Sequence, residues 1–182
     1  MKNPLSMKER VRIPRQRMPE QPPLERRHNF AKVNLGLEAA LAGREASRCI
    51  ECADPKCVAG CPVGVQVREF VDLVLQGDFK AAATRMRQDN VLPAVTGRVC
   101  PQEDQCEGAC VMGKKFDPLA IGYLERFIAD WEAASGELAL PARAPRKSEW
   151  ITFTRKQPTA AAWKITPAEE TWFQISKPRP GS

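Results

Sequence analysis

Several features that define other protein classes are missing from this chain of 182 residues. Its eleven glycines include no G-x-G sequence. Because the G-x-G-x-x-G fingerprint supports dinucleotide binding, we expect the chain alone to bind neither flavin nor nicotinamide. No run approaches about 18 apolar residues, the length that spans a membrane, and the N-terminus lacks the apolar segment of a signal peptide. The sequence therefore predicts a cytoplasmic protein without a membrane span.

Cysteine is absent from most of the chain and concentrated in one region. All seven cysteines lie between residues 49 and 110. An odd number leaves one thiol unpaired in any disulfide scheme, and a disulfide framework also needs an oxidising compartment. The cysteines are therefore better explained as metal ligands. They form the patterns C-x2-C-x4-C-x3-C-P (Cys49, Cys52, Cys57, Cys61) and C-x5-C-x3-C (Cys100, Cys106, Cys110).

The kind of metal site follows from the spacing. The first pattern is close to the bacterial ferredoxin run C-x2-C-x2-C-x3-C-P, whose fourth cysteine ligates the other of two clusters. Structural zinc is the main alternative, but zinc ligands usually form two pairs separated by a longer loop. Here four cysteines crowd into thirteen residues, and the only histidine, His28, lies twenty-one residues before the first. The spacing favours iron–sulfur clusters and so predicts electron transfer.

Two four-iron clusters need eight ligands, and the chain offers seven thiolates. We therefore expect an oxygen ligand near the second cysteine pattern. A helix is predicted downstream, with Asp117 as N-cap and Pro118 at its first position, and Glu125 falls on its apolar face. A carboxylate there needs a compensating charge. Iron would supply it, and so would a salt bridge to Arg126, Arg98 or another basic residue; the residues alone leave both open. The apolar positions are Ile121, Leu124, Ile128 and Trp131.

Four motifs carry a family resemblance: RCIEC, GCPVGV, LPAVTGRVCPQEDQCEGAC and IGYLERF. Over roughly residues 20–140 the chain resembles the N-terminal iron–sulfur domain of the glutamate synthase small subunit. It is similar to the same module in dihydropyrimidine dehydrogenase and in the large subunit of NADH-dependent ferredoxin:NADP oxidoreductases. The resemblance implies a small helical domain that holds two [4Fe–4S] clusters.

The resemblance also implies which residues bind each cluster. In pyrimidine-reducing relatives a glutamine stands at the position of Glu125, which supports a ligand role there. The implied set for cluster 1 is Cys49, Cys52, Cys57 and Cys110. The implied set for cluster 2 is Cys61, Cys100, Cys106 and Glu125.

The resemblance further implies partners. The relatives continue into FAD- and NAD(P)-binding domains, so FAD and NAD(P)H are expected on a partner chain or on a missing domain. The chain would then not be catalytic alone. It would relay electrons between a flavoprotein subunit and a second redox enzyme subunit, such as that of glutamate synthase. The alternative function is a structural iron–sulfur module or a zinc-bound assembly module.

Periodicity and charge divide the chain into three predicted parts. Apolar residues recur at helical spacing in 67–74 and 79–86, and no segment alternates for long, which predicts a mostly α fold with little sheet. The predicted core, 28–142, carries a net charge of −4. Two extended basic arms flank it, 1–27 and the Pro/Trp-containing tail 143–182, each with a net charge of +5. Basic arms suit nucleic acid, but no nucleic-acid-binding motif is present, so we expect no nucleic-acid partner.

Overall fold

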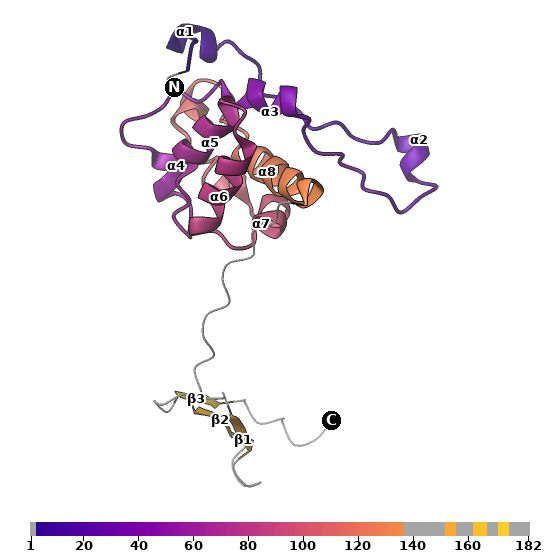
Figure 1. The fold of residues 1–182 in the computed structure, drawn as a ribbon, viewed down its shortest axis with the longest axis vertical. Helices are drawn as coiled ribbons and strands as arrows, with labels where there is room; N and C mark the ends of the chain where they lie inside the picture. The colour runs from indigo at the N-terminus through magenta and orange to yellow at the C-terminus, as the bar shows by residue number, and fades with distance from the viewer. Residues whose placement is uncertain (1–2, 137–151, 156–161, 167–170, 175–182) are drawn as a thin grey trace. The chain divides into compact units, whose positions relative to one another are not determined.

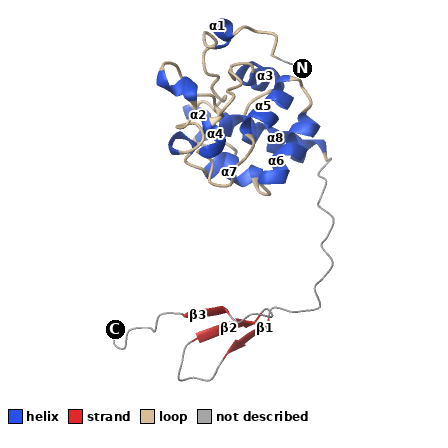
Figure 2. Ribbon diagram, turned by 90° about the vertical axis from the view of Figure 1, so that its left-hand side faces the viewer, coloured by secondary structure: helices blue, strands red, loops and turns tan. Residues whose placement is uncertain are grey.

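The computed structural model describes residues 3–136 and three short strands at 152–155, 162–166 and 171–174. The chain divides into two compact units, Met1–Leu138 and Ala139–Ser182. The described part of the first unit is helical, and the second contains the strands (Figures 1 and 2). The prediction of a mostly helical protein is confirmed. None of the helices in the described part is long and apolar enough to span a membrane.

The first unit consists mainly of short helices joined by loops (Figure 1). The α-helices are α1 (Met7–Arg10), α2 (Pro23–Arg26), α3 (Ala39–Ala46), α4 (Lys56–Ala59), α5 (Val67–Leu75), α6 (Phe79–Asp89), α7 (Pro93–Val99) and α8 (Ile121–Ser135). The 3-10 helices are η1 (Gln102–Asp104) and η2 (Val111–Lys114). Four pairs of helices pack closely: α5 with α6, α7 with α8, α3 with α5, and α6 with α8.

Helices α5 and α6 form the centre of the core, as their apolar periodicity predicts. Gly77 has a φ of 76°, which glycine adopts without strain, and turns the chain between them. The Asp78 side chain then caps α6 by accepting a hydrogen bond from the Ala81 amide at 2.9 Å. The buried residues of the two helices are Val67, Phe70, Val71, Val74, Ala82, Ala83 and Met86.

Helix α8 buries most of its length against α6 and α7. The Phe79 ring meets the Phe127 ring edge-on, with centroids 5.1 Å apart. On the other side Gly97 allows close approach to α7, because a Cβ there would lie 2.8 Å from the Arg126 amide nitrogen. Gly136 ends α8 in the left-handed conformation. The helix therefore presents Glu125 toward the interior of the domain, where it is 7% exposed.

The predicted start of α8 is wrong. Its N-cap is Ala120, not Asp117, and the helix begins at Ile121. The cause is a tertiary contact: the Arg48 guanidinium donates to the carbonyl oxygens of Asp117 (2.7 Å) and Pro118 (3.1 Å). Because these two carbonyl oxygens accept hydrogen bonds from Arg48, the segment before Ala120 does not join the helix.

Part of the basic N-terminal segment packs against the helical core. Met18 joins the hydrophobic core, and Glu20 forms an isolated antiparallel bridge with Asn34. The Gln16 amide donates to the Glu45 carboxylate at 2.8 Å. Glu45 in turn forms a fully buried ion pair with Arg48 at 2.6 Å. The N-terminal residues thus belong to the same unit as the cysteines.

The second unit contains a small antiparallel sheet in the order β1–β2–β3, where the sequence predicts an extended tail. Its strands are β1 (Thr152–Arg155), β2 (Ala162–Thr166) and β3 (Thr171–Gln174). Thr152 pairs with Thr166, and Ala162 with Gln174. Each strand is four or five residues long, too short for alternation to stand out. The strands are nevertheless rich in the threonine and aromatic residues that favour sheet.

Candidate functional site

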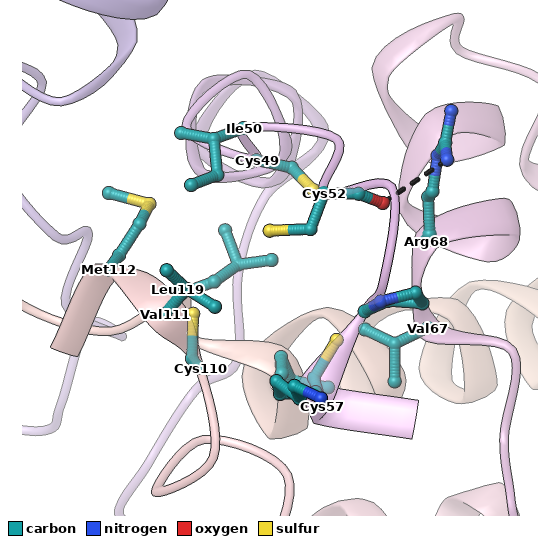
Figure 3. A pocket seen from close by; sticks show the side chains of 13 residues that line it. Cys49, Ile50, Cys52, Cys57, Val67, Arg68, Cys110, Val111, Met112 and Leu119 are labelled. Atoms are coloured by element: carbon teal, nitrogen blue, oxygen red, sulfur yellow. Dashed lines mark hydrogen bonds between the residues drawn. The ribbon is translucent and has the colours of Figure 1, made fainter. Parts of the chain in front are cut away.

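Four of the seven cysteines line one pocket in the first unit. Cys49 follows α3, Cys52 lies in the next loop, Cys57 is in α4 and Cys110 directly precedes η2. Figure 3 shows their thiols facing a common space from these separate segments. The pocket is partly open to solvent. The four thiols therefore converge on one space from separate segments, as ligands of a shared group must.

The wall of this pocket is mostly apolar. Apart from the cysteines, only Lys56 and Arg68 carry polar side chains among the lining residues. Arg68 donates to the Cys52 carbonyl oxygen at 3.2 Å and so fixes the loop that carries this cysteine (Figure 3). The apolar lining residues are Ile50, Pro55, Val67, Val111, Met112, Leu119 and Ile121.

Burial raises the pKa of three thiols in this first group. It raises the pKa of Cys49 and that of Cys57 to about 11, and it also raises the pKa of Cys52. Neighbouring thiols add to the effect: Cys52 and Cys110 act on Cys49, and Cys110, Cys49 and Cys52 act on Cys57. These mutual influences place the four thiols in one electrostatic group. A bound metal would reverse the shifts, because a coordinated thiol is deprotonated.

The other three cysteines form a second set, and two of them, Cys100 and Cys106, lie near enough to Glu125 to be affected by its charge. Cys61 follows α4, Cys100 caps the C-terminus of α7, and Cys106 is buried after η1. Burial is the largest cause of the raised pKa of Cys100, and Glu125 and Cys61 add to it. Burial also raises the pKa of Cys106 to about 12, with contributions from Glu107, Cys61 and Glu125. The structure thus brings together a second group of three thiols and one carboxylate.

Glu125 has no cationic partner in the part of the chain that the structure describes. Arg126 and Arg98 both pair with Asp130 instead, so neither provides the salt bridge considered from the sequence. The Glu125 carboxylate is held by neutral donors: Asn90 Nδ2 at 2.9 Å and Thr96 Oγ1 at 2.5 Å, both to Oε1. Burial raises the pKa of Glu125, and these two hydrogen bonds lower it.

The seven thiols and the Glu125 carboxylate are better arranged to bind iron–sulfur clusters than to bind single metal ions. Within residues 3–136 and the described strands, no three His, Cys, Asp or Glu side chains lie close enough together to bind one metal ion. A four-iron cluster spreads its ligands more widely, because each thiolate binds a different iron. Soft thiolates are also the ligands that such clusters use. Two groups, each with four donors, therefore match the needs of two such clusters.

The single histidine, His28, does not join these groups. It is exposed and accepts a hydrogen bond from Arg27 at 2.9 Å. Asn90 and Thr96 could not be identified from the sequence, because polar residues near a helix terminus carry no specific ligand signal.

Comparison with known proteins agrees with this chemistry. The family model described as dihydropyrimidine dehydrogenase domain II, 4Fe-4S cluster, matches residues 26–137. The putative oxidoreductase AegA of Escherichia coli (strain K12) is 39% identical over 112 residues, covering 61% of this chain and 17% of that protein.

Two further relatives are redox subunits. The glutamate synthase [NADPH] small chain of Halomonas elongata is 34% identical over 126 residues, or 69% of this chain and 27% of that protein. The NAD-dependent dihydropyrimidine dehydrogenase subunit PreT of Escherichia coli (strain K12) is 40% identical over 96 residues, which cover 53% of this chain and 23% of that protein. The chain spans less than a third of each relative. Because the family model matches more than half of the chain, the chain belongs to the dihydropyrimidine dehydrogenase domain II family of 4Fe-4S cluster domains.

Proposed function

We propose that this electron-transfer domain binds two [4Fe–4S] clusters. Cluster 1 would be held by Cys49, Cys52, Cys57 and Cys110. Cluster 2 would be held by Cys61, Cys100, Cys106 and Glu125. The observation that carries the proposal is the pocket that Cys49, Cys52, Cys57 and Cys110 line together, whose lining includes none of the other three cysteines.

The chain's own residues hold the two groups close together. Cys57 lies in α4 and Cys61 follows that helix, so one helical turn links a ligand of each cluster. Cys106 and Cys110, four positions apart in the turn that follows η1, form a second link between the groups. Gly60 keeps the links compact, because a Cβ there would lie 2.9 Å from the Gln105 carbonyl oxygen. A bound [4Fe–4S] cluster supplies one-electron chemistry. The two links thus favour direct transfer between the sites.

Metal and sulfide analysis tests the two-cluster proposal. Anaerobically reconstituted protein should contain about eight iron and about eight sulfide per chain. Reduction should give a reversible electron paramagnetic resonance signal, which a purely structural cluster would not give in a usable potential range. Saturation near four iron would contradict the second cluster. Preferential zinc binding would support the zinc-bound assembly module instead.

We also propose that the domain relays electrons between a flavoprotein subunit with FAD and NAD(P)H and a second redox subunit, such as that of glutamate synthase. The names of the relatives support this, since they include an NADPH-dependent glutamate synthase and an NAD-dependent dehydrogenase. The seven cysteines are free, which suits the reducing cytoplasm. In this arrangement 28–142 would carry the clusters and the basic tail 143–182 would attach the flavoprotein.

Truncation after Pro141 tests the role of the tail. The cut lies outside the unit Met1–Leu138, so iron content should stay unchanged. Recovery of a flavoprotein from native cell extract, identified by its flavin absorbance and by mass spectrometry, should fall. Equal recovery by the full and truncated chains would place the flavoprotein contact on the helical unit instead.

A further inference from the structure

An N-terminal hook, residues 3–10, holds the loop that carries two ligands of the first group. Arg10 is central to it and is only 8% exposed. Its guanidinium donates to the Cys49 carbonyl oxygen at 2.8 Å and lies 3.2 Å from the Glu51 carboxylate. It also donates to the carbonyl oxygens of Leu5 (2.8 Å) and Asn3 (3.3 Å). One buried arginine thus ties the start of the chain to the segment between Cys49 and Cys52.

Asn3 strengthens the same attachment. Its side chain is buried and donates from Nδ2 to the Ser47 carbonyl oxygen at 2.9 Å. Its backbone amide donates to the Glu51 carboxylate at 3.4 Å. The Asn3 side-chain oxygen accepts from the Leu5 amide at 3.0 Å, which keeps the hook closed. The hook therefore contacts the loop on both sides of Cys49.

The loop needs such support, because its backbone is strained. Glu51 has a φ of 53°, the one positive φ among the described non-glycine residues. This conformation is unfavourable for an L-residue other than glycine. Glu51 immediately precedes Cys52, so its backbone sets the direction of this thiol relative to Cys49. The strain persists where surrounding contacts determine the conformation, and Arg10 and Asn3 supply contacts to the Glu51 side chain.

We infer that Arg10 is a positioning residue for the first ligand group, and that the Arg10–Glu51 ion pair controls the charge next to it. The inference rests on the proposed two-cluster function. A negative charge near an iron–sulfur site stabilises the oxidised form and lowers the reduction potential, whereas a positive charge raises it. In the intact pair the two charges compensate. Loss of the guanidinium would leave the Glu51 carboxylate uncompensated beside Cys49 and Cys52.

The test compares reduction potentials in the full chain, measured by redox titration followed by electron paramagnetic resonance. Variants Cys57→Ser and Cys106→Ser assign the two transitions to the first and second groups. Arg10→Gln should lower the potential of the first transition and leave the second unchanged. It should also speed the loss of iron from the first group to a chelator by about tenfold or more, as the loss of an outer-shell partner does.

Charge compensation separates the inference from a merely structural effect. Glu51→Gln should raise the first potential, and the double variant R10Q/E51Q should return it toward the wild-type value. Arg10→Lys keeps the charge and should shift the potential less than Arg10→Gln. Arg12→Gln is the matched control: this arginine is exposed and two residues further on, so neither transition should move.

Each outcome decides the inference. Unchanged first potentials in Arg10→Gln and Glu51→Gln would overturn it. If Arg10→Gln fails to fold, Glu51→Gln keeps the hook's arginine, and the absence of a rise in that variant would overturn it as well. Wild-type protein without two redox transitions would overturn the two-cluster function, and this inference with it.

Discussion

Asn90 donates a hydrogen bond from Nδ2 to Glu125 Oε1 at 2.9 Å, and both side chains are buried. Thr96 Oγ1 donates to the same oxygen. No hydrogen bond to Oε2 occurs among the described residues. The carboxylate is therefore fixed through one oxygen by neutral donors, and its other oxygen is available to a ligand. This arrangement suits a carboxylate that binds metal through a single oxygen.

Replacement of Glu125 should affect the second group alone. In Glu125→Ala the cluster held by Cys61, Cys100 and Cys106 lacks its fourth protein ligand, so iron content should fall from about eight toward about four per chain. The redox transition of the first group should persist. Glu125→Cys should retain the iron and lower the potential of the second group, because a thiolate donates more electron density. Iron analysis and redox titration measure both.

Glu132 provides the matched control on the same helix. It is a buried carboxylate that pairs with Arg87 at 2.7 Å. Glu132→Ala should reduce stability, since one partner of a buried pair is lost, but it should leave iron content unchanged. Equal iron in Glu125→Ala and wild type would identify Glu125 as a structural residue and place the eighth ligand elsewhere.

Asn90 and Thr96 should act through Glu125. Asn90→Ala or Thr96→Val removes one of the two donors that orient the carboxylate, so loss of iron from the second group to a chelator should become about tenfold faster. In the Glu125→Cys background, which keeps the iron but has no carboxylate to orient, neither substitution should change the rate further. A double-mutant cycle measures this coupling. Additive effects would mean that the two donors stabilise the fold independently of the carboxylate.

Gly60 should be essential to both sites, since it lies between Cys57 and Cys61. A Cβ at this position would lie 2.7 Å from the Ala109 Cβ and 2.9 Å from the Gln105 carbonyl oxygen. Gly60→Ala must therefore push apart the segments that carry ligands of both groups, and iron content should fall at both. Gly43→Ala is the control: a Cβ there meets nothing within 4 Å. It should stabilise α3 by about 1 kcal/mol and leave iron unchanged.

The sequence predicts the parts of this site whose chemistry is local. Cysteine spacing identifies the thiols, and the ligand count directs attention to a carboxylate near them. The apolar periodicity of α5 and α6 also matches their buried faces. These features are readable because each depends on residues that lie close together in the sequence.

Contacts between segments that are distant in the sequence could not be predicted from the sequence. Arg10 reaches Cys49 across 39 positions, and Asn90 reaches Glu125 across 35. Arg48 draws the carbonyl of Asp117 out of the predicted helix across 69 positions. Arginine and asparagine are common surface residues, so a single sequence gives no reason to choose these among the others.

The protein without iron should lose stability at alkaline pH. Burial raises the pKa of Cys49 and of Cys57 from 9.0 to about 11, and that of Cys106 to about 12. The folded state thus holds these protons more tightly than the unfolded chain. The resulting stabilisation is complete below pH 9.0 and is lost as the pH rises from there through about 11–12. The urea midpoint of the iron-free protein should therefore fall between about pH 8 and about pH 10.5.

Two comparisons isolate the thiols as the cause. A variant with serine at Cys49, Cys57 and Cys106 should lose most of this alkaline decline, although it keeps every lysine and the single tyrosine. Reconstituted protein should also lose it, because coordinated thiols are already deprotonated and release no proton on further rise in pH. A midpoint in the iron-free wild type that stays constant over the same range would show that these thiols are not buried in the absence of metal. The cysteine-lined pocket would then form only when the cluster binds.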